Sequence, residues 1–123
     1  MRPAIVIAAH RRPVALARLL ASIDRAAYPP RADIPLVISI DPLPEGDPAA
    51  PDGLAVLRLA EDFGWRHGPK TIQRRPGPLG LVTHFIACGE LSRTYGSIVF
   101  LEDQREVADR LTGWAEAKWM DPR

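Results

Sequence analysis

Two apolar runs of this chain end on carboxylates. Residues 98–101 lead directly into Glu102 and Asp103, and residues 34–40 end on Asp41. Because open α/β sheets bind their ligands at the carboxyl ends of parallel strands, these acids are expected to face a ligand there. Carboxylate oxygens favour a hard cation such as Mg²⁺ or Mn²⁺, which takes one or two protein carboxylates and completes its shell with phosphate and water.

Cationic and imidazole side chains follow a third apolar run. Residues 4–9 lead into His10, Arg11 and Arg12, which are expected at the same edge of the sheet and are candidates for binding a nucleotide sugar. Acids at two strand ends and cations at a third suit a ligand with a base or sugar hydroxyls to recognise and a phosphate to neutralise. A nucleotide diphosphate sugar has all of these groups. A dication held by the acids would stabilise the charge on a departing diphosphate as a Lewis acid.

The elements that position these residues alternate between strand and helix patterns. Strands are expected over residues 4–10, 34–41, 70–74 and 98–101. Helices are expected from Pro13 to Ala27, from a cap at Asp52 to Gly64, over residues 79–95 and, as an amphipathic pattern, over residues 107–115. This order predicts an α/β, Rossmann-like domain with a mostly parallel central sheet of about four strands and helices on both faces.

The same alternation is typical of response-regulator-like receivers of similar length. A receiver needs an acidic pair after its first strand, where this chain has His10, Arg11 and Arg12. The receiver interpretation is therefore less favoured.

The composition is that of a soluble globular domain. Hydrophobic residues make up 46% and charged residues 25% of the 123 residues, and the net charge of +1 gives no reason to expect a nucleic-acid or membrane surface. No apolar run approaches the ~20 residues of a membrane-spanning helix, so a cytoplasmic protein is expected. The single cysteine, Cys88, excludes an intrachain disulfide and is expected in the core.

Two further features have a structural interpretation. His84 falls within an expected helix and is predicted to be packed and hydrogen-bonded there. The basic stretch over residues 66–75 is predicted to be a solvated face, because acids elsewhere in the chain balance its charge.

Several segments together resemble GT-A-fold glycosyltransferases. The opening AIVIAAHRRPVALARLLASI is similar to the first strand and helix of that family, and IPLVISID is similar to its second strand with a closing Asp. The segment GPLGLVTHFIACGELSRTYGSIVFLEDQREVADRLTGWAEA is similar to the N-acetylglucosaminyltransferase I-like branch and its bacterial sugar-transferase relatives, where a His-bearing helix precedes an EDD motif. The resemblance covers essentially the whole chain, and residues 79–107 are its most specific part.

The resemblance implies a role for each of the acids. Asp41 would receive the edge of the nucleotide base, Asp103 would lie near the ribose, and Glu102 would support the water shell of the metal. Gln104 replaces the acid that is the direct metal ligand in the family, so the binding of Mn²⁺ or Mg²⁺ is expected to be weaker. Arg11 stands where the family usually has Asn.

The resemblance also implies that residues 1–123 form a single nucleotide-sugar-binding domain. Family catalytic domains continue into an acceptor-binding half, which supplies the general base for inverting transfer, and this chain is expected to lack that half. The expected function is metal-assisted glycosyl transfer from a donor such as a UDP-sugar or, alternatively, non-catalytic nucleotide-sugar binding in a scaffold domain. An α/β interaction module without a ligand is a third interpretation. Trp114 and Trp119 would be exposed without an acceptor half, and their exposure would favour self-association through the C-terminal helix.

Overall fold

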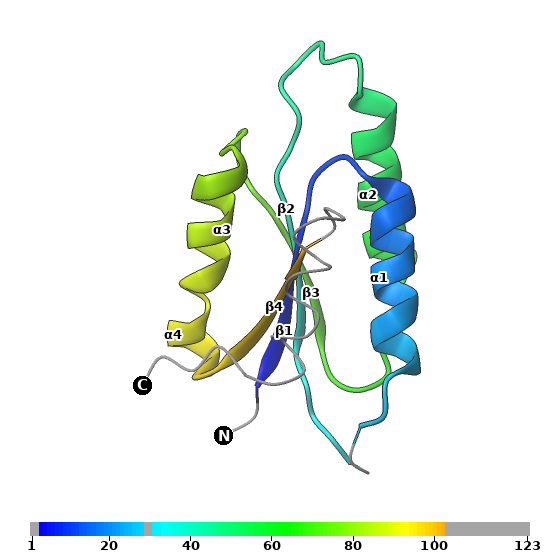
Figure 1. Cartoon of the computed structure of the whole chain (residues 1–123), viewed down its shortest axis with the longest axis vertical. Helices are drawn as coiled ribbons and strands as arrows, with labels where there is room; N and C mark the ends of the chain where they lie inside the picture. The colour runs from blue at the N-terminus through cyan, green and yellow to red at the C-terminus, as the bar shows by residue number, and fades with distance from the viewer. Residues whose placement is uncertain (1–2, 29–30, 103–123) are drawn as a thin grey trace.

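The computed structural model describes residues 3–28 and 31–102, within which four strands form one all-parallel sheet. The strand order is β3-β2-β1-β4 (Figure 1). The strands are β1 (Ala4–Ala9), β2 (Leu36–Ile40), β3 (Lys70–Arg74) and β4 (Ile98–Glu102). The predicted α/β, Rossmann-like architecture with a parallel central sheet is confirmed.

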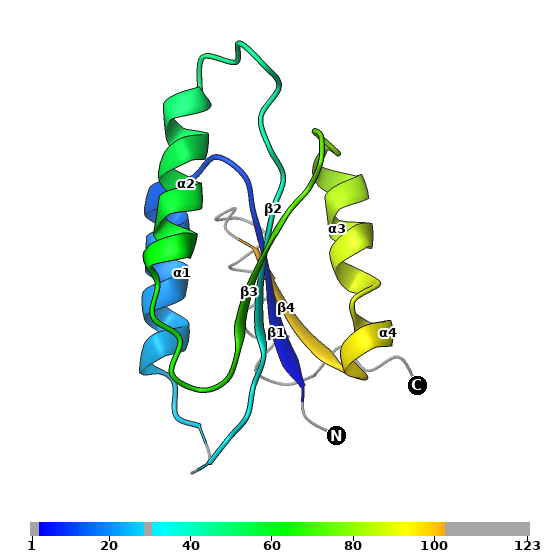
Figure 2. The same cartoon turned by 180° about the vertical axis from the view of Figure 1, so that it is seen from behind.

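Helices cover both faces of the sheet, as predicted. α1 (Pro13–Arg25) and α2 (Ala50–Asp62) lie together on one face, and α3 (Leu81–Gly89) and α4 (Ser92–Tyr95) lie on the other (Figures 1 and 2). The chain adds β2 and β3 on one side of β1 and then β4 on the other side, so right-handed crossovers place the later helices on the opposite face. Within the described ranges, no helix is both long enough and apolar enough to cross a membrane.

Burial on both faces explains why the sequence of β1 is continuously apolar. Ile5, Ile7 and Ala9 pack in a cluster with the buried side chains of α1 and α2, because side chains alternate between faces along a strand. The intervening residues of β1 pack in a second cluster with Cys88 and Phe100. Cys88 is fully buried, which confirms its predicted place in the core, and burial raises the pKa of its thiol.

The second helix begins before its predicted cap at Asp52. α2 starts at Ala50, and Pro51 stands in its first turn, where the missing N–H of proline removes no hydrogen bond. Asp47 provides a polar oxygen in the turn before the helix, since its Oδ1 accepts the N–H of Ala49 at 2.8 Å. The cap is Ala49, so the sequence prediction of this boundary was wrong by three residues, because Asp47 rather than Asp52 bonds to the backbone at the entry to the helix.

The helix predicted over residues 79–95 is divided in two. α3 ends at Gly89, and the N–H of Leu91 donates to the carbonyl of Cys88 at 3.1 Å in a turn tighter than that of an α-helix. The single turn of α4 follows. Gly89 weakens a helix by roughly 1 kcal/mol relative to Ala, which favours a break at this point.

Four named residues and one predicted element lie outside the described residues. They are Asp103, Gln104, Trp114, Trp119 and the amphipathic helix over residues 107–115. What the sequence predicts for them stays a prediction.

Lys70 connects the start of β3 to the end of α2. Its Nζ donates to the carbonyl oxygens of Ala60, Glu61 and Phe63 at 2.7, 2.8 and 2.7 Å. The last carbonyls of a helix have no partner within the helix and carry the negative end of its dipole, so an ammonium group stabilises them. This contact fixes the end of α2 against the strand that follows it.

Replacing Lys70 by Met is predicted to lower the free energy of unfolding by about 1–3 kcal/mol, because three hydrogen bonds from a charged donor are lost while the apolar stem is kept. Urea denaturation followed by circular dichroism measures this change. Arg66→Met is the matched control, because Arg66 makes only an exposed ion pair with Asp24, a kind of contact worth about 0–1 kcal/mol. Equal effects of the two substitutions would contradict the role given to Lys70.

Candidate functional site

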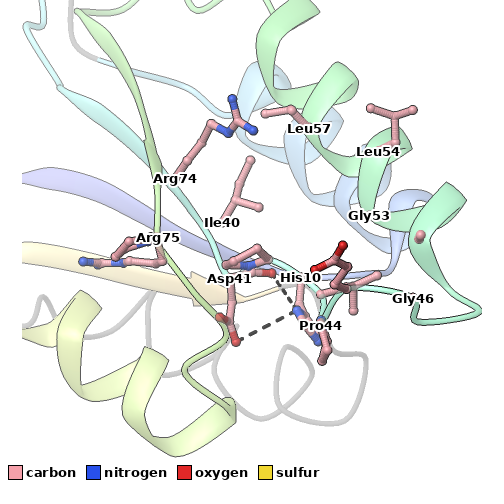
Figure 3. Close-up of a pocket in the computed structure, with 15 residues that line it drawn as sticks. His10, Ile40, Asp41, Pro44, Gly46, Gly53, Leu54, Leu57, Arg74 and Arg75 are labelled. Carbon is pink, nitrogen blue, oxygen red and sulfur yellow. Dashed lines mark hydrogen bonds and ion pairs between the residues drawn. The ribbon is translucent and has the colours of Figure 1, made fainter.

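A cleft of about 460 Å³ opens at the carboxyl ends of β2 and β3 (Figure 3). This volume falls within the ~300–1,000 Å³ that is usual for small-molecule sites. The walls come from the loop between β2 and α2, from the first half of α2 and from the residues that end β2 and β3. Its lining side chains include His10, Ile40, Asp41, Glu45, Leu54, Leu57 and Arg74.

Local sequence explains how the loop between β2 and α2 forms one wall. Gly46 has φ +80°, a conformation that favours glycine, and the N–H of Asp47 donates to the carbonyl of Pro44 at 3.1 Å. Gly53 allows the loop to approach the helix, because a Cβ at that position would lie 2.9 Å from Leu43 Cδ1. Glycines at these two positions therefore shape the loop that forms this wall of the cleft.

Asp41, directly beyond the end of β2, is hydrogen-bonded to the residues that precede α3. Its side chain is buried, with 3% exposed, and its Oδ1 accepts the N–H of Leu79 at 2.8 Å while Oδ2 accepts the N–H of Gly80 at 3.2 Å. Gly80 has φ +81°, which a residue with a side chain rarely adopts, so its glycine is required for this geometry. Both carboxylate oxygens of Asp41 are thus used within the chain.

His10 lies against Asp41, as expected for residues at one edge of the sheet. Its Nδ1 is 2.7 Å from the backbone carbonyl oxygen of Asp41 and 4.0 Å from Oδ2 (Figure 3). Arg11 and Arg12 are exposed and do not line the cleft, and the carbonyl of Arg12 accepts the N–H of Leu16 at the start of α1. The structure therefore brings two of the predicted residues together and leaves the two arginines on the surface nearby.

Glu102 ends β4 at the same edge of the sheet. Its strand pairs with β1 so that Glu102 is level with Ala8, while Ala9 is level with Ile40, the residue before Asp41. The two acids thus stand on strands that flank β1. Glu102 is 1% exposed. Within residues 3–28 and 31–102, no group of three or more His, Cys, Asp or Glu side chains is placed to hold a metal ion.

A buried polar network occupies the α3 side of this edge. Ser39 Oγ accepts a hydrogen bond from Arg75 Nε at 3.0 Å and lies 2.8 Å from His84 Nε2. Because Oγ already accepts from Arg75, its own O–H is available to donate to the imidazole. His84 is 3% exposed, which confirms the prediction of a packed and hydrogen-bonded histidine. Burial lowers its pKa, with Arg75 and His10 acting in the same direction and Asp41 acting against them.

Two arginines that the sequence interpretation assigned to a solvated face border the site. Arg74 pairs in register with Ile40, and the N–H of Arg75 donates to the carbonyl of Ile40 at 3.0 Å. Both arginines line the cleft: Arg74 is exposed, as predicted, and reaches toward Leu57, whereas Arg75 is half-buried and its side chain extends in a different direction (Figure 3). The Nη2 atom of Arg75 is buried and has no hydrogen-bond partner among the described residues. The sequence did offer a signal in their position, because Arg74 ends the predicted strand over residues 70–74 and Arg75 follows it, as Asp41 follows β2.

Comparison of the chain with protein-family models, with curated proteins and with solved structures finds no match.

The titration of His84 is predicted to contribute to the pH dependence of the free energy of unfolding. Since its folded-state pKa lies below the usual 6.5, the unfolded chain binds the proton more strongly, so this contribution to stability is complete above about pH 6.5 and decreases as the pH falls toward the lowered value. His84→Gln keeps a polar side chain and removes this titration. Urea denaturation at a series of pH values on both sides of 6.5 should give a shallower pH dependence for the variant, and parallel curves would refute the assignment.

Proposed function

We propose that this chain is a nucleotide-sugar-binding domain of the GT-A type, which holds a donor such as a UDP-sugar for metal-assisted glycosyl transfer. One observation carries the proposal: His10, Asp41 and Arg74 surround a cleft of about 460 Å³ at the carboxyl ends of neighbouring parallel strands. Open α/β sheets bind nucleotides at this edge. The sequence resemblance to GT-A-fold glycosyltransferases supports the same ligand class.

The charges at this edge suit a diphosphate. Arg74 offers an exposed guanidinium in the cleft, and a guanidinium matches the geometry of phosphate oxygens. His10, which follows β1, lines the same cleft from the other side of β2. These groups would orient the diphosphate along the edge, toward the end of β4.

A divalent cation fits the β4 end of the edge. Mg²⁺ and Mn²⁺ need only one or two protein carboxylates when phosphate and water supply the other ligands, and Glu102 ends β4 there. Such a cation would supply Lewis-acid stabilisation of the leaving diphosphate. Gln104, which stands at the family position of the direct metal ligand, would contribute a neutral oxygen and therefore a weaker bond.

A second candidate is non-catalytic nucleotide-sugar binding. Gln104 favours it from the sequence, because the replaced acid would remove a charge from the metal site. In this case Arg74 would neutralise the diphosphate without a cation.

Isothermal titration calorimetry with UDP, GDP and their sugars, in Mn²⁺ and in EDTA, tests both candidates. The first predicts binding that Mn²⁺ strengthens, because the cation bridges protein and phosphate. The second predicts binding of equal affinity in EDTA. Absence of binding by every nucleotide under both conditions would contradict the proposed function in either form.

Gln104→Asp is predicted to tighten Mn²⁺-dependent binding about tenfold, which corresponds to about 1.4 kcal/mol, because it restores a charged ligand. Gln104→Asn keeps a neutral amide and is the matched control. An unchanged affinity of the Asp variant in Mn²⁺ would show that position 104 is not the weak point of the metal site.

A further inference from the structure

The cleft beside α2 has walls suited to one particular part of a nucleotide sugar. We propose that it receives the nucleoside end of the donor and that Arg74 holds the adjacent phosphate. This inference rests on the proposed function, because it assigns one part of that ligand to one part of the same edge. Three observations support the inference: the hydrogen bonds of Asp41, the apolar walls of the cleft and the positions of its charged side chains.

Asp41 is not available to a nucleotide base without a rearrangement. Its two oxygens accept the N–H groups of Leu79 and Gly80, and the side chain is almost completely buried. Hydrogen bonds to an ionised carboxylate are roughly twice as strong as those between neutral groups. Each oxygen keeps a second lone-pair site, but Asp41 is only 3% exposed, so a base has little access to that site and is better accommodated beside Asp41 than on it.

The cleft beside Asp41 offers that place. Ile40, Leu54 and Leu57 line it together with Pro44 and Pro76, so its walls are mainly apolar. Leu54 is 49% exposed, so about half of this side chain is open to a ligand in the cleft. A flat heterocycle that covered Leu54 would remove apolar surface from water, and this is the main source of affinity for such rings.

Two charged side chains of the cleft match the rest of a nucleoside phosphate. Glu45, in the loop between β2 and α2, is exposed and presents a carboxylate, which accepts hydrogen bonds from a ribose diol. Arg74, at the end of β3, presents a guanidinium for the phosphate. Base, ribose and phosphate therefore each have a matching group on walls that the fold has already formed.

Titration of ¹⁵N-labelled chain with UDP, and in parallel with GDP, tests the assignment through three glycine amides. Gly46 and Gly53 line the cleft, and Gly80 donates to Asp41. The proposal predicts that the signals of Gly46 and Gly53 shift with saturation while that of Gly80 stays in place. A shift of Gly80 without shifts of Gly46 and Gly53 would overturn it, because the base would then have recruited Asp41.

Two variants measure the contributions of wall and charge. Leu54→Ser is expected to lower the affinity for UDP and for uridine alike by about fivefold, because both ligands would cover the same apolar wall. Arg74→Met is expected to lower the affinity for UDP about tenfold or more and the affinity for uridine by less than about twofold, because only UDP carries phosphate. Val14→Ser, at another exposed apolar position, on α1, is the matched control and should leave both affinities unchanged. Thermal unfolding confirms that each variant is folded.

The outcomes separate this inference from the proposal beneath it. If neither UDP nor GDP binds, the proposed function and this inference both fail. If a nucleotide binds but Leu54→Ser and Arg74→Met match the Val14→Ser control, only the assignment to the cleft fails, and the nucleotide lies elsewhere on the edge.

Discussion

A buried carboxylate at the end of β2 organises the edge on which the proposed site depends. Removing a carboxylate from water is costly, and Asp41 offsets this cost through its hydrogen bonds with the backbone of Leu79 and Gly80. These bonds fix the point at which α3 starts. Because α3 starts there, His84 and Cys88 face the sheet one helical turn apart, and His84 meets Ser39 on β2.

The parallel sheet places residues from separate parts of the sequence at one edge. Every strand ends at the same edge, so the residues after β1, β2 and β3 meet although they are far apart in the chain. Arg74, the last residue of β3, and Arg75, the residue after it, both line the cleft, and Arg75 also donates to Ser39 on β2. The end of β3 thereby contributes both to the cleft and to the hydrogen bond with Ser39.

Sequence reasoning predicted the strands and the topology because continuous apolar runs are a strong signal of buried parallel strands. It placed β3 correctly at Lys70–Arg74 in spite of its polar composition. It did not predict the role of Arg74, because a basic stretch is usually solvated and only the pairing with Ile40 brings it to the cleft. Nor did it predict the partners of Asp41, because the N–H groups of Leu79 and Gly80 are 38 and 39 residues away along the chain.

Amide hydrogen exchange at Leu79 and Gly80 tests most directly whether Asp41 organises this edge. Both amides precede α3 and lie in a loop, where exchange is normally fast. The account predicts slow exchange at both positions in the unmodified chain and clearly faster exchange in Asp41→Ala, with the amides of β1 still protected. Fast exchange at Leu79 and Gly80 in the unmodified chain would contradict it.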